Sequence, residues 1–494
     1  MIQRILTAIC CLSLTVISCK HEPLIPKQPN GSGYPDEVAK IFVNKCATAG
    51  CHNAASYEGA GGLRMDTWEQ LFNGGNNGSA IVPYSIEFSP LLYYINTDFN
   101  LGIVAQPTMP KDNPPLSKEE YITIRDWVAK GAPDKSGNIP FASDPATRQK
   151  IYITMQACDQ VAVIDAQKKV VMRYIPVGTS AIAEVPHYLR STTDGKYAFV
   201  SFVAGTTLQK IETSTDKVVE DIQLPTNPSG SWNVFALSPD ASKVLVSDWR
   251  ASGRLVYIDL LTMKMKVYPG FTYPHGIASN PSFDTFYVTS QYGNAMYKLS
   301  LDGFVNKQIS LDGKTPVVTP DTSSSMLNPH EILMAPDYSK YFITCERSNE
   351  VRVLNRSRDS VIKVIPVGAK PQEFAISRKK PYLFVTCMDD QPTKLGDVTF
   401  VGSVYVIDYN TLSVVNVIRG NFSSPHGITV DDVNNTVCFA SRNVNPTGPK
   451  PHHTSSCTGA NGSYHVYDMT TFQPADKRRF EVLPDPYSAD ARFK

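Results

Sequence analysis

Two cysteines and a histidine lie within seven residues near the start of the chain, in the stretch CATAGCH. They are Cys46, Cys51 and His52. Two thiols beside an imidazole can attach and ligate a haem, can give three ligands to a structural zinc ion, or can close a local disulfide. A further candidate is Met109 in QPTMPKDNPP, where the flanking prolines hold the backbone extended.

The other residues of the chain favour the haem interpretation. A disulfide would leave the adjacent His52 and the proline-bracketed Met109 without a role, and zinc would need a fourth ligand nearby. Met65 in GGLRMDTW is a second methionine that could face a metal, but core packing is the more common role at such a position.

Two predicted helices would place these residues. PDEVAKIFVNKC has apolar residues at helical spacing behind an expected Asp36 cap, so Cys46 comes at a helix C-terminus. LSKEEYITIRDWVAKGAP has Ser117 and Glu120 in the register of a capping box and ends at Gly131. The methionine loop lies between the two helices.

This order of elements resembles a small all-α class I cytochrome c. The resemblance implies one covalent haem c, with Cys46 and Cys51 as thioether attachments, His52 as proximal ligand and Met109 as distal ligand of the iron. The spacing departs from the family pattern, because C-x-x-C-H is usual and this chain has C-x-x-x-x-C-H. Residues 47–50 must therefore bulge outward, which their small side chains and Gly50 allow.

The N-terminus predicts export. MIQRILTAICCLSLTVISC has one early positive charge and an apolar run, and its ending resembles the bacterial lipobox, which implies lipidation of Cys19. Residues 1–19 are then a lipoprotein signal peptide and residues 20–33 a linker rich in Pro and Gly. We expect a cell-envelope protein anchored by lipid on the periplasmic or cell-surface side of a membrane. Ordinary secretion is the alternative.

The rest of the chain repeats an apolar strand, a polar turn and a second strand rich in β-branched and aromatic residues. Six copies carry, as second residue of the first strand, His187, Asn233, His275, His330, Gln372 and His426. Four strands per unit of about fifty residues are typical of propeller blades. The pattern resembles the YVTN repeat family, whose second-strand motif appears here as FYVTS, YFITC and LFVTC.

The two ends of this region supply a seventh blade. PYSADARF looks like a first strand without a successor, and KIYITMQ like a second strand without a predecessor. We therefore predict two domains: a cytochrome c-like domain over residues 34–135 and, after a linker at 136–148, an all-β seven-bladed propeller over 149–494 that the C-terminal strand closes.

First strands line the channel of such a propeller, so His187, His275, His330 and His426 should gather at one mouth. Cys345 and Cys387 lie at equivalent ends of second strands on the same face, as does a long loop with His452, His453 and Cys457. This mouth could bind a metal ion or an oxidisable ligand. Alternatively, Pro-His is a turn feature of the repeat whose imidazoles bond to neighbouring backbone, and the cysteines are buried strand residues.

Three functions follow. The first is a lipid-anchored monohaem cytochrome that transfers electrons outside the cytoplasm to a redox protein or a small molecule. The second is an oxidoreductase with its substrate or metal at the channel mouth, and the third a binding propeller of the envelope without redox chemistry. A net charge of +1 and 19% charged residues give no reason to expect nucleic acid as a partner.

Overall fold

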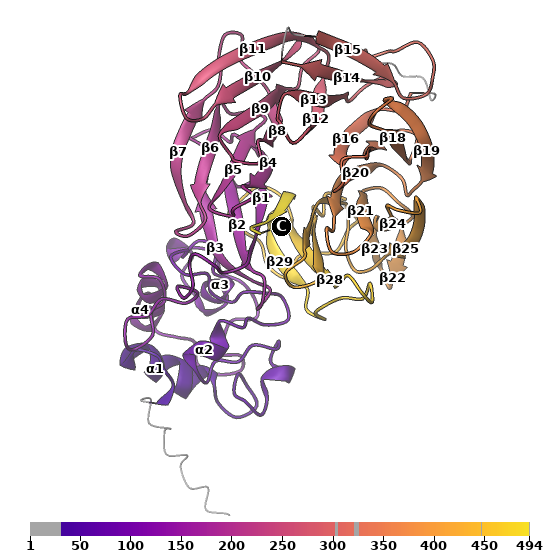
Figure 1. Ribbon diagram of the computed structural model, residues 1–494. Coiled ribbons are helices and arrows are strands. Elements are labelled where there is room, and N and C mark those ends of the chain that lie inside the picture. Colours follow the sequence, from indigo (N-terminus) through magenta and orange to yellow (C-terminus); the bar gives the residue numbers. More distant parts are fainter. Residues whose placement is uncertain (1–30, 302–304, 321–325, 446, 494) are drawn as a thin grey trace, which may run out of the picture.

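The computed structural model of the chain describes residues 31–493, with gaps at 302–304, 321–325 and 446. The expected signal peptide of residues 1–19, its lipidated Cys19 and most of the linker at 20–33 lie outside the described residues. Within them, a small helical part precedes a large β part (Figure 1).

The helical part has short helices joined by long irregular segments. Its elements are α1 (Asp36–Ile41), the π-helix η2 (Phe42–Cys46), the 3₁₀-helices η3 (Tyr57–Gly59) and η4 (Phe99–Leu101), α2 (Trp68–Leu71), α3 (Pro90–Ile95) and α4 (Lys118–Ala129). The predicted capping box of Ser117 and Glu120 is present at α4. The expected Asp36 cap is wrong: Pro35 holds the N-cap position with φ −54°, and Asp36 is already the first helical residue.

Aromatic rings hold the first and last helices together. Tyr34, Phe42 and Trp127 meet edge to face with ring centroids 5.3 to 6.1 Å apart. At the rim of this core, Lys45 Nζ lies 2.6 Å from Glu120 Oε1 and links η2 to α4. Cys46 is thus the last residue of a helix that contacts α4 both through aromatic rings and through this ion pair.

The described residues of the β part form seven four-stranded antiparallel sheets, which are the blades of a propeller. Five blades are β4 (Pro186–Ser191), β5 (Tyr197–Phe202), β6 (Thr207–Glu212) and β7 (Lys217–Gln223); β8 (Trp232–Leu237), β9 (Lys243–Asp248), β10 (Gly253–Asp259) and β11 (Lys264–Phe271); β12 (Pro274–Ser279), β13 (Thr285–Ser290), β14 (Ala295–Ser300) and β15 (Val305–Ser310); β16 (Pro329–Met334), β17 (Lys340–Cys345), β18 (Glu350–Asn355) and β19 (Ser360–Pro366); and β26 (Pro425–Asp431), β27 (Thr436–Ser441), β28 (Asn461–Asp468) and β29 (Phe480–Pro484). A sixth consists of β20 (Pro371–Ile376), β21 (Tyr382–Cys387), β24 (Ser403–Asp408) and β25 (Ser413–Ile418), with the hairpin β22 (Thr393–Leu395) and β23 (Val398–Phe400) inserted.

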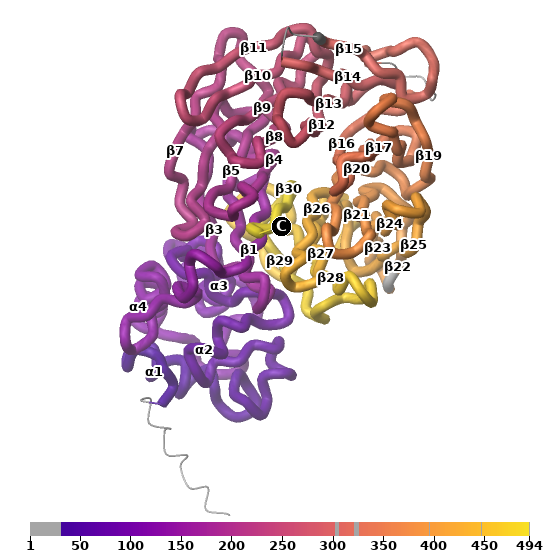
Figure 2. Tube along the Cα trace, viewed as in Figure 1, coloured from indigo at the N-terminus to yellow at the C-terminus, as the bar shows by residue number. Residues whose placement is uncertain are grey.

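The seventh blade joins the two ends of the repeat region, as predicted. Its order is β3 (Val170–Pro176), β2 (Gln160–Asp165), β1 (Lys150–Met155) and the C-terminal β30 (Pro486–Ala491). Ile151 pairs with Ala491 and Tyr152 with Asp490. The first strands of successive blades contact one another around the ring, and Figure 2 shows β30 lying between β1 and β26. The C-terminal strand therefore supplies the innermost strand of the seventh blade and closes the ring.

Hydroxyl groups of the second strands join four of the blades to the blade that follows. Thr289, Thr344 and Thr386, the threonines of the YVTN-like motifs, donate to the backbone carbonyls of His330, Gln372 and His426 at 2.6, 2.9 and 2.7 Å. Ser201 makes the same bond to Asn233. The recurring hydroxyl thus fixes where the first strand of the following blade begins.

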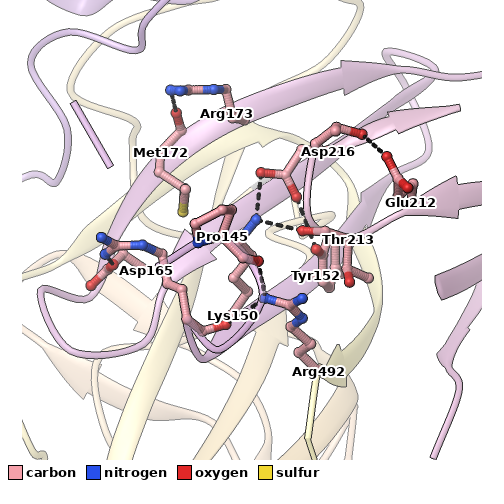
Figure 3. A network of polar contacts seen from close by, with 12 residues as sticks. Pro145, Lys150, Tyr152, Asp165, Met172, Arg173, Glu212, Thr213, Asp216 and Arg492 are labelled. Atoms are coloured by element: carbon pink, nitrogen blue, oxygen red, sulfur yellow. Dashed lines mark hydrogen bonds and ion pairs between the residues drawn. The ribbon is translucent and has the colours of Figure 1, made fainter. Parts of the chain in front are cut away.

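A buried ion pair ties the closing blade to its neighbour (Figure 3). Lys150 Nζ lies 2.7 Å from Asp216 Oδ2 and also donates to the carbonyl of Thr213 at 2.7 Å. Tyr152 donates to the other carboxylate oxygen of Asp216 at 2.9 Å. Arg492, next to the closing strand, donates its amide to the carbonyl of Lys150 at 2.8 Å.

The helical part packs against the first and last blades. Phe88 meets Tyr174 of β3 edge to face at 5.3 Å, and Ser79 Oγ donates to the carbonyl of Val171 at 2.8 Å. Asn73 accepts from Lys168 Nζ at 2.7 Å through its side-chain oxygen. These contacts orient the helical part relative to the propeller.

Candidate functional site

Cys46, Cys51 and His52 lie on one turn that follows η2. The amide of His52 donates to the carbonyl of Cys46 at 3.1 Å, which brings the histidine back beneath the helix end. Between them Gly50 has φ +80°, and a Cβ there would meet no atom within 4 Å. The two additional residues of the C-x-x-x-x-C-H spacing are thus accommodated in a loop that points away from the core.

The ring of His52 is held by one hydrogen bond to the backbone. Its Nδ1 lies 2.9 Å from the carbonyl oxygen of Leu63, and because a carbonyl only accepts, Nδ1 carries the proton. Burial lowers the pKa of His52, so the imidazole is neutral at pH 7. Nε2 then keeps its lone pair, which is the arrangement that a histidine ligand of a metal needs.

The two thiols are free, and their surroundings differ. Cys46 is buried and desolvation raises its pKa to about 12, whereas Cys51 is partly exposed. Cys46 and Cys51 therefore do not form the local disulfide considered from the sequence. The part of the chain that the structure describes has no group of three or more His, Cys, Asp or Glu placed to hold a metal ion, so the zinc alternative lacks its ligand set.

The two methionine candidates differ in position. Met109 is partly buried against the hydrophobic cluster that contains Cys46, and its amide donates to the carbonyl of Tyr94 at 2.8 Å. Met65 is 1% exposed, and its amide donates to the carbonyl of His52 itself at 2.8 Å. Both methionines lie outside the helices, Met65 fully buried in the core next to His52 and Met109 partly buried against the cluster that contains Cys46.

These residues fit a covalently bound haem. The donor set joins two free thiols, one neutral imidazole whose Nε2 keeps its lone pair, and one thioether. Of these residues, Cys46 belongs to the apolar cluster and Met109 packs against it. A haem bound there would supply one-electron exchange, and the thioether would favour the reduced iron. The chain supplies the neutral imidazole and the apolar surroundings.

The predicted gathering of histidines at the channel mouth is present. The seven residues at the second position of the first strands are His187, Asn233, His275, His330, Gln372, His426 and Tyr487. Their aromatic members form a closed ring of contacts. Centroids are 4.5 Å apart for His187 and Tyr487, 3.8 Å for Tyr487 and His426, and 4.0 Å for His330 and His275, with 6.0 to 6.2 Å for the remaining two contacts.

This ring consists of neutral, desolvated imidazoles. Burial lowers the pKa of all four histidines, that of His330 to about 3. The guanidinium of Arg442 lies over the ring of Tyr487 at 4.6 Å and further disfavours a positive charge at His187 and His426. The rings of His426 and Tyr487 stack, whereas the other four contacts are tilted or edge to face. Among the described residues, these histidines are not part of a group placed to hold a metal ion.

Cys345 and Cys387 do not join the histidines. Each is fully buried in a different hydrophobic cluster between blades, and desolvation raises both thiol pKa values. Their strand positions pair with Pro329 and Pro371, directly before the ring residues, but alternate side chains of a strand point to opposite faces. The histidines and these two cysteines therefore do not form the combined site that was expected from the sequence.

Three features of the structure were not predicted from the sequence: a backbone hydrogen bond to His52, a seventh residue of the channel ring, and a disulfide. The carbonyl of Leu63 has no side-chain signature, and Tyr487 was assigned to the closing strand without being recognised as the seventh ring residue. Cys158 and Cys457 form a disulfide across 299 residues, with Cα atoms 5.4 Å apart. Their loops are far apart in sequence, and only the closure of the propeller brings them together.

Comparison with protein families finds the Planctomycete cytochrome C family at residues 49–112. The matched segment contains Cys51, His52, Met65 and Met109 and begins three residues after Cys46. Residues 49–112 are a cytochrome c domain. The cytochrome c domain followed by a seven-bladed propeller agrees with the organisation expected from the sequence.

Comparison with solved structures finds similar folds. A functionally unknown protein from Desulfotomaculum acetoxidans is 12% identical with a TM-score of 0.50 and covers 68% of this chain and 99% of its own. Kuenenia stuttgartiensis Hydrazine Synthase is 14% identical with a TM-score of 0.46, covering 63% of this chain and 88% of its own. Comparison with curated proteins found no match. Among the described helices, none is both long and apolar enough to cross a membrane.

Proposed function

We propose that this protein is an exported monohaem c-type cytochrome that transfers electrons outside the cytoplasm. Cys46 and Cys51 would attach the haem, His52 would be the proximal ligand and Met109 the distal ligand. The redox partner would be a protein or a small molecule that donates or accepts electrons at the cytochrome c domain. The propeller would serve as the scaffold that the cytochrome c domain packs against.

The observation that carries the proposal is the state of His52. Its Nδ1 proton is held by the carbonyl of Leu63, burial keeps the ring neutral, and the histidine directly follows a free thiol in a cytochrome c domain. Here one nitrogen orients the ring and the other remains available to iron.

The residues around the site do two further things. The apolar cluster of Phe42, Leu92 and Ile95 excludes water, which lowers the local dielectric and influences the reduction potential. Burial raises the pKa of Cys46 to about 12, so this side chain is a protonated thiol at neutral pH. With a haem bound, the site would gain and lose single electrons without moving protons at His52.

Export and anchoring complete the proposal. The lipobox-like Val16-Ile17-Ser18-Cys19 supports a lipid anchor at Cys19 and a place in the cell envelope, facing the periplasm or the cell surface. The disulfide between Cys158 and Cys457 supports the same conclusion, because structural disulfides persist in oxidising compartments.

The test is a haem stain on denatured protein, made in a host with cytochrome c maturation. We expect covalent haem in the native sequence and none in the Cys46→Ala/Cys51→Ala variant. The matched control is Cys345→Ala/Cys387→Ala, which removes two buried thiols from the propeller and should keep the haem. Absence of haem from the native protein would contradict the proposal and leave a non-redox binding propeller. Additional bound copper or iron, lost in His275→Ala, would instead favour the oxidoreductase alternative.

A further inference from the structure

A loop of the propeller reaches the helical part next to Met109. It runs from β27 to β28, over residues 442–460, and contains His452, His453 and Cys457. The disulfide to Cys158 anchors its far end, and Ser456 Oγ donates to the carboxylate of Glu87 in the cytochrome c domain. The loop is thus tied to both domains.

A buried carboxylate sets the conformation of the two histidines. Glu481 of β29 accepts from the amides of His452 and His453 at 2.8 and 3.4 Å. It accepts a third bond from Asn461 Nδ2 at 3.1 Å. Three hydrogen bonds to one carboxylate therefore hold this stretch of loop against the propeller.

The side chain of His452 contacts Tyr94 of the cytochrome c domain. Tyr94 Oη lies 2.7 Å from His452 Nδ1 and 3.0 Å from the backbone carbonyl oxygen of His452. One arrangement satisfies both contacts: the hydroxyl donates to the carbonyl and accepts from Nδ1–H. Beside it, the ring of Tyr93 packs against His453 with centroids 5.6 Å apart.

The same two tyrosines hold the methionine loop by their backbone. The carbonyl of Tyr94 accepts from the amide of Met109 at 2.8 Å, and that of Tyr93 accepts from Ala105 at 2.9 Å. Both tyrosines belong to α3. The side chains of this short helix contact the propeller loop, and its backbone carbonyls accept hydrogen bonds from the methionine loop. A displacement of Tyr94 would move Met109 with it.

We propose that His452 is a positioning residue for the distal ligand: through Tyr94, the propeller loop holds Met109 at the haem. The inference rests on the proposed function, since it needs a haem ligated by Met109. Its consequence is that the propeller takes part in setting the reduction potential, and that a partner which moves the loop would change that potential.

The experiment uses the full-length, haem-loaded protein. Methionine ligation is followed by the charge-transfer absorption band between the thioether and ferric iron, and the potential by redox titration. His452→Ala removes the contact between Nδ1 and the Tyr94 hydroxyl but keeps the backbone carbonyl of residue 452, whereas Tyr94→Phe removes both bonds. We therefore expect both variants to reduce methionine ligation, about threefold in His452→Ala and up to about tenfold in Tyr94→Phe. The potential should fall, by about 59 mV for each tenfold change in the reduction equilibrium.

The matched controls separate positioning from stability. Tyr93→Phe removes a neighbouring hydroxyl that donates within the cytochrome c domain, to the carbonyl of Glu87, and should leave band and potential unchanged. His452→Asn keeps a side-chain donor and should restore part of both. The double variant His452→Ala/Tyr94→Phe should be no worse than Tyr94→Phe alone, because loss of the Tyr94 hydroxyl already removes both bonds.

Three negative results have different meanings. An unchanged band and potential in folded His452→Ala and Tyr94→Phe, with the native protein showing the methionine band, would overturn the positioning role alone. A native protein with covalent haem but no methionine band would refute Met109 as ligand, and a native protein without haem would refute the proposed function and this inference with it.

Discussion

Replacing Lys150 by methionine should destabilise the propeller strongly, because it leaves a buried carboxylate without its cation. The side chains of Lys150 and Asp216 are 2% and 5% exposed, and they join β1 of the closing blade to the turn after β6 of the next (Figure 3). Burial lowers the pKa of Lys150, and the nearby Asp216 opposes that effect by stabilising the ammonium.

The expected loss in the free energy of unfolding follows from the interactions that remain after the substitution. Methionine keeps most of the apolar stem, so little packing is lost, but Asp216 would retain only the bond from Tyr152, and the carbonyl of Thr213 would lose its donor. Removing one partner of a buried ion pair costs about 3–5 kcal/mol. The variant Lys150→Met/Asp216→Asn removes both charges and should recover most of that loss, because no unpaired charge stays buried.

Urea denaturation, followed by tryptophan fluorescence and by circular dichroism, measures the free energy of unfolding of each variant. The control is Lys196→Met/Asp194→Asn, which removes an ion pair whose side chains are 73% and 53% exposed and should change stability by less than about 1 kcal/mol. A loss below about 1 kcal/mol in Lys150→Met, or a double variant no more stable than the single one, would refute the reasoning.

Two further predictions concern the channel and the seams between blades. Burial lowers the pKa of His330 to about 3, below its value in the unfolded chain. The contribution of the neutral imidazole to the free energy of unfolding is therefore complete above about pH 6.5. It is lost as the pH falls toward 3, at about 1.4 kcal/mol per pH unit. His330→Gln should therefore lose less stability than the native protein between pH 6 and pH 4 in urea denaturation, and equal slopes would contradict this. Thr344 Oγ1 donates to the carbonyl of Gln372 and accepts from the amide of Glu331, both at 2.9 Å, so Thr344→Val should cost about 1–3 kcal/mol in the same assay, whereas a cost near zero would show that the hydroxyl does not hold the seam.

The local pattern predicted the first and last helices and the repeated strands, with one error at a helix start, but it did not predict α2, α3 or the hairpin β22–β23. The capping box at Ser117 and Glu120 was correct because both partners lie within one turn of the same helix. The Asp36 cap was wrong because Pro35, with its restricted φ, takes the boundary position. The closing strand was predictable because a first strand was missing at one end of the repeats and unpaired at the other.

The candidate sites show which contacts the local sequence pattern could not predict. The residue types of CATAGCH and the position of Met109 indicated a haem, but the carbonyl of Leu63 that orients His52 belongs to a backbone with no distinguishing side chain. Cys345 and Cys387 were placed on the correct face by strand counting. Their side chains nevertheless point into separate cores, because neighbouring residues of a strand face opposite ways.

The sequence by itself determined which chemistry is available and which architecture carries it, since ligand types, spacing and strand periodicity are properties of short segments. Only the tertiary structure decided which distant groups meet: Cys158 with Cys457, Tyr487 with His426, and His452 with the tyrosine beside Met109. The physical reason is closure. When the last strand completes the first blade, it brings together loops that are hundreds of residues apart, and no local pattern records that distance.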